Sequence, residues 1–137
     1  MLKDDLREKL ITTALAAREW AYAPYSGYKV GAALLTASGR IYDGTNVENA
    51  AYPSSICAER VAVFKAVSEG ERHFEAIAVA TQNGGAPCGA CRQVLSEFGR
   101  DTIVLIVADE GKVVREATVA ELLPNAFGPG DLPDSAN

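Results

Sequence analysis

Apolar side chains recur every three or four residues in several segments of the chain, which predicts amphipathic helices. The predicted helices span residues 4–22, 58–70, 88–99 and, shorter, 118–123. The first has its apolar stripe on Leu6, Leu10, Ala14, Ala17 and Ala21. Proline and glycine in the PYSG that follows end this helix, and Gly70 and Gly99 close the next two.

Runs of apolar and β-branched residues between these helices predict strands. The predicted strands span residues 29–37, 40–46, 75–81, 102–109 and 112–117. The first two are joined by Ser38-Gly39 and read as a β-hairpin. The continuous run IVLIVA in the fourth strand is typical of a sheet centre that is covered on both faces. The fifth strand is expected at an edge.

The order of the elements is α, β, β, α, β, α, β, β, α. A hairpin followed by alternating helices and strands predicts an α/β domain with one mixed sheet and helices packed against it. At 137 residues the chain fits a single domain over residues 1–137. From about residue 124 onward, three prolines and two glycines predict an irregular tail.

Composition and net charge indicate which kinds of molecule the protein can bind. The hydrophobic fraction of 48% argues against disorder, and the longest strongly apolar run is far too short to span a membrane. The N-terminus alternates charge with leucine and has no signal-peptide core, so we expect a cytoplasmic protein. The formal net charge is −5 without a visible basic patch, which disfavours nucleic-acid polymers and favours a small-molecule ligand.

Three cysteines carry the most specific chemistry. Cys57 stands at the start of the second predicted helix, and Cys88 and Cys91 stand at the start of the third. Residues three apart share a helix face, and the positive end of the helix dipole favours the thiolate form. Three thiolates would leave one position of a tetrahedral zinc for water, as in catalytic zinc sites.

Other interpretations of these cysteines remain open at this point. PCGAC alone could be a redox pair, and His73, the single histidine, could close a structural Cys₃His zinc site. A redox pair explains neither Cys57 nor Glu59, which lies two residues after Cys57. A carboxylate there could move the protons of a zinc-bound water, provided that Cys57 lies at the helix cap or first turn.

The spacing C-A-E at 57–59 and P-C-G-A-C at 87–91 matches the signature of zinc deaminases. Further similar segments are AYAPYSGYKVGAAL, GTNVENAAYP, CAERVAVFKAVSEG, PCGACRQVLSEF and ELLPNAF. With these, nearly the whole chain resembles the small, zinc-dependent cytidine deaminases. The resemblance implies a single-domain three-layer α-β-α sandwich with a mixed five-stranded sheet. It also implies a homotetramer with shared active sites, and conversion of cytidine and 2′-deoxycytidine to uridine and 2′-deoxyuridine in pyrimidine salvage.

Residue by residue, the resemblance implies one Zn²⁺ per subunit on Cys57, Cys88 and Cys91. Glu59 falls on the proton shuttle, which would carry a proton from the zinc-bound water to N3 of cytosine and then to the departing amine. Asn46 and Glu48, which follow a predicted strand, fall on the pair that binds the ribose hydroxyls.

The resemblance also covers three further positions of the substrate pocket. Tyr28 falls where an aromatic ring, usually phenylalanine, packs near the base. The backbone N–H of Ala58 is implied to hold the pyrimidine, and Phe127 is implied to reach the pocket of another subunit.

Charge at the metal site yields one more prediction. Three thiolates and one Zn²⁺ ion carry a net charge of −1. This negative charge would weaken the ability of the zinc to acidify its bound water. Arg60, three residues after Cys57, and Arg92, directly after Cys91, are candidates to hydrogen-bond the sulfurs and offset that charge.

Two other functions remain possible from the sequence. A deaminase of a modified aminopyrimidine nucleoside, such as a blasticidin-type antibiotic, would share CxE and PCxxC but differ around NVEN. A catalytically silent zinc-binding oligomer would not need Glu59.

Overall fold

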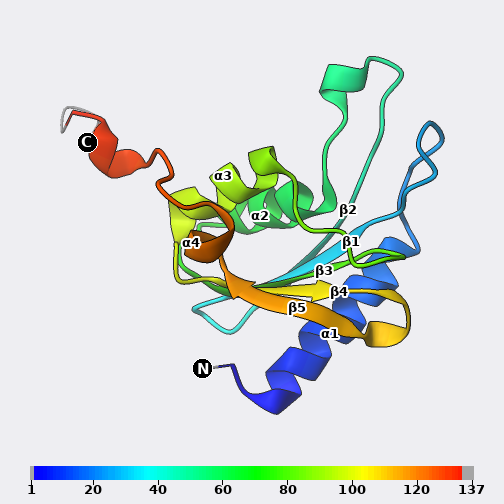
Figure 1. Cartoon of the computed structure of the whole chain (residues 1–137), viewed down its shortest axis with the longest axis horizontal. Coiled ribbons are helices and arrows are strands. Elements are labelled where there is room, and N and C mark those ends of the chain that lie inside the picture. Colours follow the sequence, from blue (N-terminus) through cyan, green and yellow to red (C-terminus); the bar gives the residue numbers. More distant parts are fainter. Residues whose placement is uncertain (1, 134–137) are drawn as a thin grey trace.

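Five strands form one mixed sheet in a computed structural model that describes residues 2–133 (Figure 1). The strands are β1 Gly31–Thr36, β2 Ile41–Thr45, β3 Phe74–Ala80, β4 Ile103–Val107 and β5 Val113–Thr118. Their order across the sheet is β2-β1-β3-β4-β5, and only β3 and β4 run parallel. The predicted hairpin and the edge position of the last strand are both confirmed.

Helices cover both faces of this sheet, which confirms the predicted three-layer architecture. They are α1 Asp4–Arg18, α2 Ala58–Ser68, α3 Gly89–Phe98 and the short α4 Val119–Leu122. In Figure 1, α1 lies on one side of the sheet and the other three lie on the opposite side. Each side has its own core: α1 packs with alternate residues of β1, β3 and β4, and α2, α3 and α4 pack with the others.

Strand β4 shows why the apolar run is continuous. Val104 and Ile106 lie in the core beneath α2 and α3, whereas Leu105 and Val107 lie in the core beneath α1. All four are essentially inaccessible to solvent. The prediction of a strand covered on both faces is therefore confirmed.

The first helix is shorter than predicted, because it ends at Arg18 and not at residue 22. The Tyr22 N–H donates to the Asn46 carbonyl (3.0 Å), and the Glu48 N–H donates to the Tyr22 carbonyl (2.9 Å). These bonds take the backbone of Tyr22 out of the helix. The partner segment lies far along the chain, so the local pattern could not reveal this pairing.

Two features place the starts of α2 and α3 side by side. Helix α3 connects the parallel strands β3 and β4, so it begins beyond the carboxyl end of β3. Helix α2 packs directly on β2 at Gly44, where an added Cβ would lie 2.4 Å from the Ala58 carbonyl oxygen and 2.6 Å from the Ala62 nitrogen. Only a glycine permits this close approach of backbones.

Beyond α4 the described chain is irregular apart from one 3₁₀ turn at Pro129–Asp131. It is tied to α3 where the Gln93 side chain donates to the Phe127 carbonyl (2.9 Å). The predicted tail also includes residues 134–137, which lie outside the described residues. No helix within residues 2–133 combines the length and apolar character needed to cross a membrane.

Candidate metal and catalytic site

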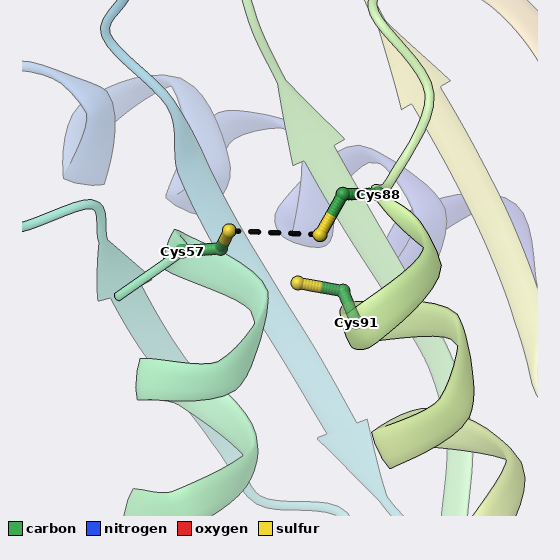
Figure 2. A group of neighbouring side chains, drawn as sticks. All are labelled: Cys57, Cys88 and Cys91. Carbon is green, nitrogen blue, oxygen red and sulfur yellow. Dashed lines mark hydrogen bonds between the residues drawn. The ribbon is translucent and has the colours of Figure 1, made fainter. Parts of the chain in front are cut away.

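The three cysteine sulfurs converge at the starts of α2 and α3 (Figure 2). Cys57 is the N-cap residue of α2, Cys88 is the N-cap residue of α3, and Cys91 lies in the first turn of α3. All three Sγ atoms lie within 4.8 Å of one another, and the Cys57 and Cys88 sulfurs are 3.8 Å apart. A tetrahedral zinc with Zn–S bonds of about 2.3 Å requires sulfurs about 3.8 Å apart. The donor set therefore fits a zinc ion.

The three thiols differ in exposure and in proton affinity. Cys91 is buried, Cys57 is partly buried and Cys88 is exposed. A hydrogen bond from the Cys91 thiol, helped by one from Arg60, lowers the pKa of Cys57 to about 5. The same hydrogen bond to Cys57, together with burial, raises the pKa of Cys91. Cys57 is thus the preformed thiolate of the cluster, and Cys91 would lose its proton on binding a metal.

The two arginines named from the sequence take different positions. The Arg60 Nη2 atom donates to Cys57 Sγ at 3.4 Å. The Arg92 guanidinium instead donates to the carbonyls of Pro87 and Leu122, both at 2.7 Å. Within the described residues Arg92 makes no hydrogen bond to a sulfur, which departs from the prediction. The carbonyls of the loop before α3 and of α4 are nearer partners for its long side chain.

His73 does not join the cluster. It lies exposed in the connection between α2 and β3. Among residues 2–133, the side chains that cluster closely enough to share a metal ion are those of the three cysteines alone. A closed Cys₃His site therefore finds no support in the geometry.

Glu59 is a buried carboxyl group directly beside the sulfurs, with a residue exposure of 4%. Burial raises its pKa to about 7, and the negative charge on Cys57 acts in the same direction. Cys57 has extended backbone angles (φ −80°, ψ 153°), so the chain is not yet helical there. This is the cap conformation required for Cys57 and Glu59 to reach the same cavity. A carboxyl with this pKa can both accept and release a proton near neutral pH.

A cavity of about 600 Å³ opens in front of Glu59, a size suited to a small molecule. Seven of the predicted site residues line it: Tyr28, Asn46, Glu48, Cys57, Glu59, Arg60 and Cys88. Ala58, Cys91, Arg92 and Phe127 are not among its lining residues. Cys91 and Ala58 are fully buried, whereas Phe127 is 58% exposed.

Asn46 and Glu48 hold the segment before β1 as well as facing the cavity. The Asn46 side chain accepts from the Val30 N–H (2.9 Å) and donates to the Tyr28 carbonyl (2.8 Å). One Glu48 carboxylate oxygen accepts from the N–H groups of Tyr25 (2.9 Å) and Ser26 (3.0 Å), and the other accepts from the Ser26 hydroxyl. The hydrogen bonds from Ser26 lower the pKa of Glu48.

The Tyr28 side chain contacts the loop between β3 and α3, to which the sequence analysis assigned no functional residue. Its hydroxyl donates to Asn83 Oδ1 at 2.7 Å, in the loop between β3 and α3. The Thr81 hydroxyl in turn accepts from the N–H groups of Gly84 and Gly85. Sequence reasoning missed Ser26, Thr81 and Asn83. The only available signal was the occurrence of small polar residues in two loops near the cysteine motifs.

Comparison with known proteins agrees with this geometry. Residues 4–107 match the family described as "Cytidine and deoxycytidylate deaminase zinc-binding region". A cytidine deaminase of Sporosarcina psychrophila is 51% identical over 127 residues, 91% of this chain and 93% of the relative. A cytidine deaminase of Halalkalibacterium halodurans is 50% identical over 131 residues, 93% of this chain and 98% of the relative. The crystal structure of cytidine deaminase from Burkholderia pseudomallei superimposes with a TM-score of 0.83 at 50% identity, covering 88% of this chain and 98% of that one.

Proposed function

The chain belongs to the cytidine and deoxycytidylate deaminase family, and from this premise we propose that it hydrolyses cytidine and 2′-deoxycytidine to uridine and 2′-deoxyuridine with release of ammonia. One observation carries the proposal beyond the similarity. A buried carboxyl group, Glu59, lies beside three converging cysteine sulfurs in a cavity of about 600 Å³. These parts together suit hydrolysis of an aromatic amine.

Cys57, Cys88 and Cys91 would hold one Zn²⁺ per subunit in this proposal. Zinc bound there would act as a Lewis acid and make water a nucleophile near neutral pH. Three thiolates and Zn²⁺ sum to −1, and the Arg60 guanidinium 3.4 Å from Cys57 Sγ supplies a compensating positive charge. Arg60 therefore supports the metal through its sulfur ligand.

Glu59 would carry the protons of the reaction. Its carboxylate accepts a proton from the attacking water and delivers it to N3 of the cytosine ring as the oxygen attacks C4. It then takes the remaining proton from the new C4 hydroxyl and passes it to the C4 amine, so that the carbonyl forms as the C4–N bond breaks and ammonia leaves. A pKa of about 7 suits Glu59 to act as both general base and general acid, because its carboxyl group binds and releases a proton at little free-energy cost near neutral pH.

The nucleoside would be held by groups that surround the cavity. Asn46 and Glu48 would bind the ribose hydroxyls, with the second N–H of Asn46 and the carboxylate of Glu48 as the polar atoms. The Tyr28 ring would pack near the base. The Ala58 backbone N–H, at the start of α2, would bind the pyrimidine, since the first N–H groups of a helix lack partners within the helix.

We also propose that residues 1–137 form one catalytic domain that assembles as a homotetramer with shared active sites. Phe127 supports this, because the residue is 58% exposed and does not line the cavity of its own chain. It is thus available to a neighbouring subunit. The three free cysteines would function as thiolates, so we propose a reducing compartment, the cytoplasm, as the place of action.

The deciding experiment is incubation of the purified zinc-loaded protein with cytidine while the absorbance is followed as uridine forms. Steady loss of cytidine absorbance that ceases in Glu59→Gln is the expected result. No turnover with zinc bound would overturn the proposal in favour of a modified nucleoside substrate or a silent zinc-binding oligomer. Native mass spectrometry of the same sample measures the zinc count and the number of subunits together.

A further inference from the structure

Side chains from two distant loops meet on one wall of the cavity. Tyr28 lies before β1, and its hydroxyl donates to Asn83 Oδ1 (2.7 Å) in the loop between β3 and α3. The Thr81 hydroxyl lies 3.4 Å from the same oxygen and accepts from the N–H groups of Gly84 and Gly85, both at 2.8 Å. This Tyr28–Asn83 link therefore connects the segment before β1 to the loop that ends at Cys88.

Tyr28 is held along its whole length. Its N–H donates to the Ser26 hydroxyl oxygen (3.0 Å), and its carbonyl accepts from the Asn46 side chain (2.8 Å). Ser26 is itself bound to Glu48. With the hydroxyl on Asn83, both ends of the residue are anchored, and the ring between them lines the cavity.

Gly85 fits closely against the end of this ring. A Cβ added at Gly85 would lie 2.4 Å from the Tyr28 hydroxyl oxygen but 3.6 Å from the ring carbon that carries it. The backbone of Gly85 is not in the left-handed region, so its conformation does not require glycine. The tyrosine hydroxyl is thus what excludes a side chain at this position.

We propose that Asn83 and Gly85 are positioning residues for the nucleoside and act through Tyr28. Asn83 holds the hydroxyl, and Gly85 leaves the space for it, so the ring stands at one place on the cavity wall. This inference rests on the proposed nucleoside substrate. Because the ring contacts bound substrate in both ground and transition states, its displacement changes KM more than kcat.

A double-mutant cycle on Tyr28→Phe and Asn83→Ala tests the link. The hydrogen bond is exposed to water, so each single variant is expected to raise KM by only about two- to fivefold. Its kcat stays within about twofold of the wild type, and the double variant shows no further rise. Multiplied effects in the double variant, or a loss confined to kcat, would overturn the proposal.

Gly85→Ala provides an independent cycle. In the wild-type background the new methyl group displaces the tyrosine hydroxyl, and KM rises to a similar extent. In the Tyr28→Phe background the methyl group makes ordinary contact, so Gly85→Ala causes no additional change. An equal penalty in both backgrounds would mean that residue 85 acts through the loop itself, and the assignment of its role would be wrong.

Two matched controls distinguish a displaced Tyr28 ring from a nonspecific effect of removing a hydroxyl group or adding a methyl group. Tyr42→Phe removes a hydroxyl that binds Glu69 away from the cavity, and Gly130→Ala adds a methyl group where no atom lies within 4 Å. Both are expected to leave KM unchanged. Zinc content and Tm, measured for every variant, should match the wild type.

Hydrogen exchange gives a reading that does not depend on turnover. Amides of the peptide covering residues 82–88 are expected to exchange faster in Tyr28→Phe and in Asn83→Ala than in the wild type or Tyr42→Phe. If wild-type protein does not turn over cytidine, the proposed function fails, and unchanged exchange would overturn the link as well. If the wild type is active while both cycles are additive, the inference alone fails.

Discussion

Removal of Arg60 should weaken zinc binding without unfolding the protein. Arg60→Ala deletes the donor 3.4 Å from Cys57 Sγ and the only guanidinium that hydrogen-bonds a sulfur within the described residues. A hydrogen bond to a charged group contributes about 1.5–3 kcal/mol. Because Cys57 is only partly buried, we take the lower part of that range. At about 1.4 kcal/mol for each factor of ten, zinc affinity should fall about tenfold.

Folding stability should change much less than zinc affinity. The Nε atom of Arg60 is buried and has no hydrogen-bond partner among the described residues. An unsatisfied buried donor costs about 1–3 kcal/mol, and the substitution removes this cost along with the favourable contact to Cys57. The two changes oppose each other. We therefore expect the Tm of the metal-free variant to stay within a few degrees of the wild type.

The assay is competition for zinc with a chromophoric chelator at neutral pH, followed by kcat measurement on the reloaded enzyme. Arg100→Ala is the matched control, because its guanidinium binds Ser96 Oγ and the Leu123 carbonyl. The control should keep wild-type zinc affinity. Zinc affinity and kcat within twofold of wild type in Arg60→Ala would refute the electrostatic argument.

Four further outcomes follow from the site and its support. Glu59→Gln should retain zinc while kcat falls by about 10²- to 10⁴-fold, the usual contribution of general acid–base catalysis, and substantial residual turnover would remove Glu59 from that role. Cys91→Ala should purify with little zinc in metal analysis, and full occupancy would exclude it as a ligand. The pKa of Glu48 is lowered by its bonds to Ser26, so its stabilising effect is complete above the ordinary value of 4.5 and is lost as pH falls through the lower folded value. The Tm difference between wild type and Glu48→Gln should accordingly shrink on acidification, and a constant difference would contradict this. Gly44→Ala should lower stability by about 1–3 kcal/mol in urea, unlike Gly130→Ala, because its Cβ meets the rigid backbone of α2.

The order and type of the helices and strands could be predicted because each leaves a local periodic pattern. The length of α1 could not, since Tyr22 leaves the helix to pair with residues 46–48, far along the chain. Hydrophobic spacing indicates which face of a helix is buried. It does not indicate that a distant segment, here the residues just after β2, forms hydrogen bonds with a backbone group that the helix would otherwise use.

The identities of the cluster residues could be predicted from spacing, but their contacts depend on the folded arrangement. Arg60 and Arg92 both lie within three residues of a cysteine, yet among the described residues only Arg60 hydrogen-bonds a sulfur. The choice depends on which carbonyls lie within reach of each guanidinium. Asn83 had no signal of its own, because its partner Tyr28 is 55 positions away.

The position of Cys57 and Cys88 along the chain has a consequence for the unfolded state. The two residues are 31 positions apart, and α2 and the central strand β3 lie between them. An ion bound by both closes this segment into a ring, as a covalent crosslink would. By the chain-entropy relation used for disulfides, a closed loop of that length raises the free energy of unfolding by about 3–4 kcal/mol. The metal centre would thus also serve as a tether on the middle of the sheet, so that losing the ion loosens the scaffold as well as stopping the reaction.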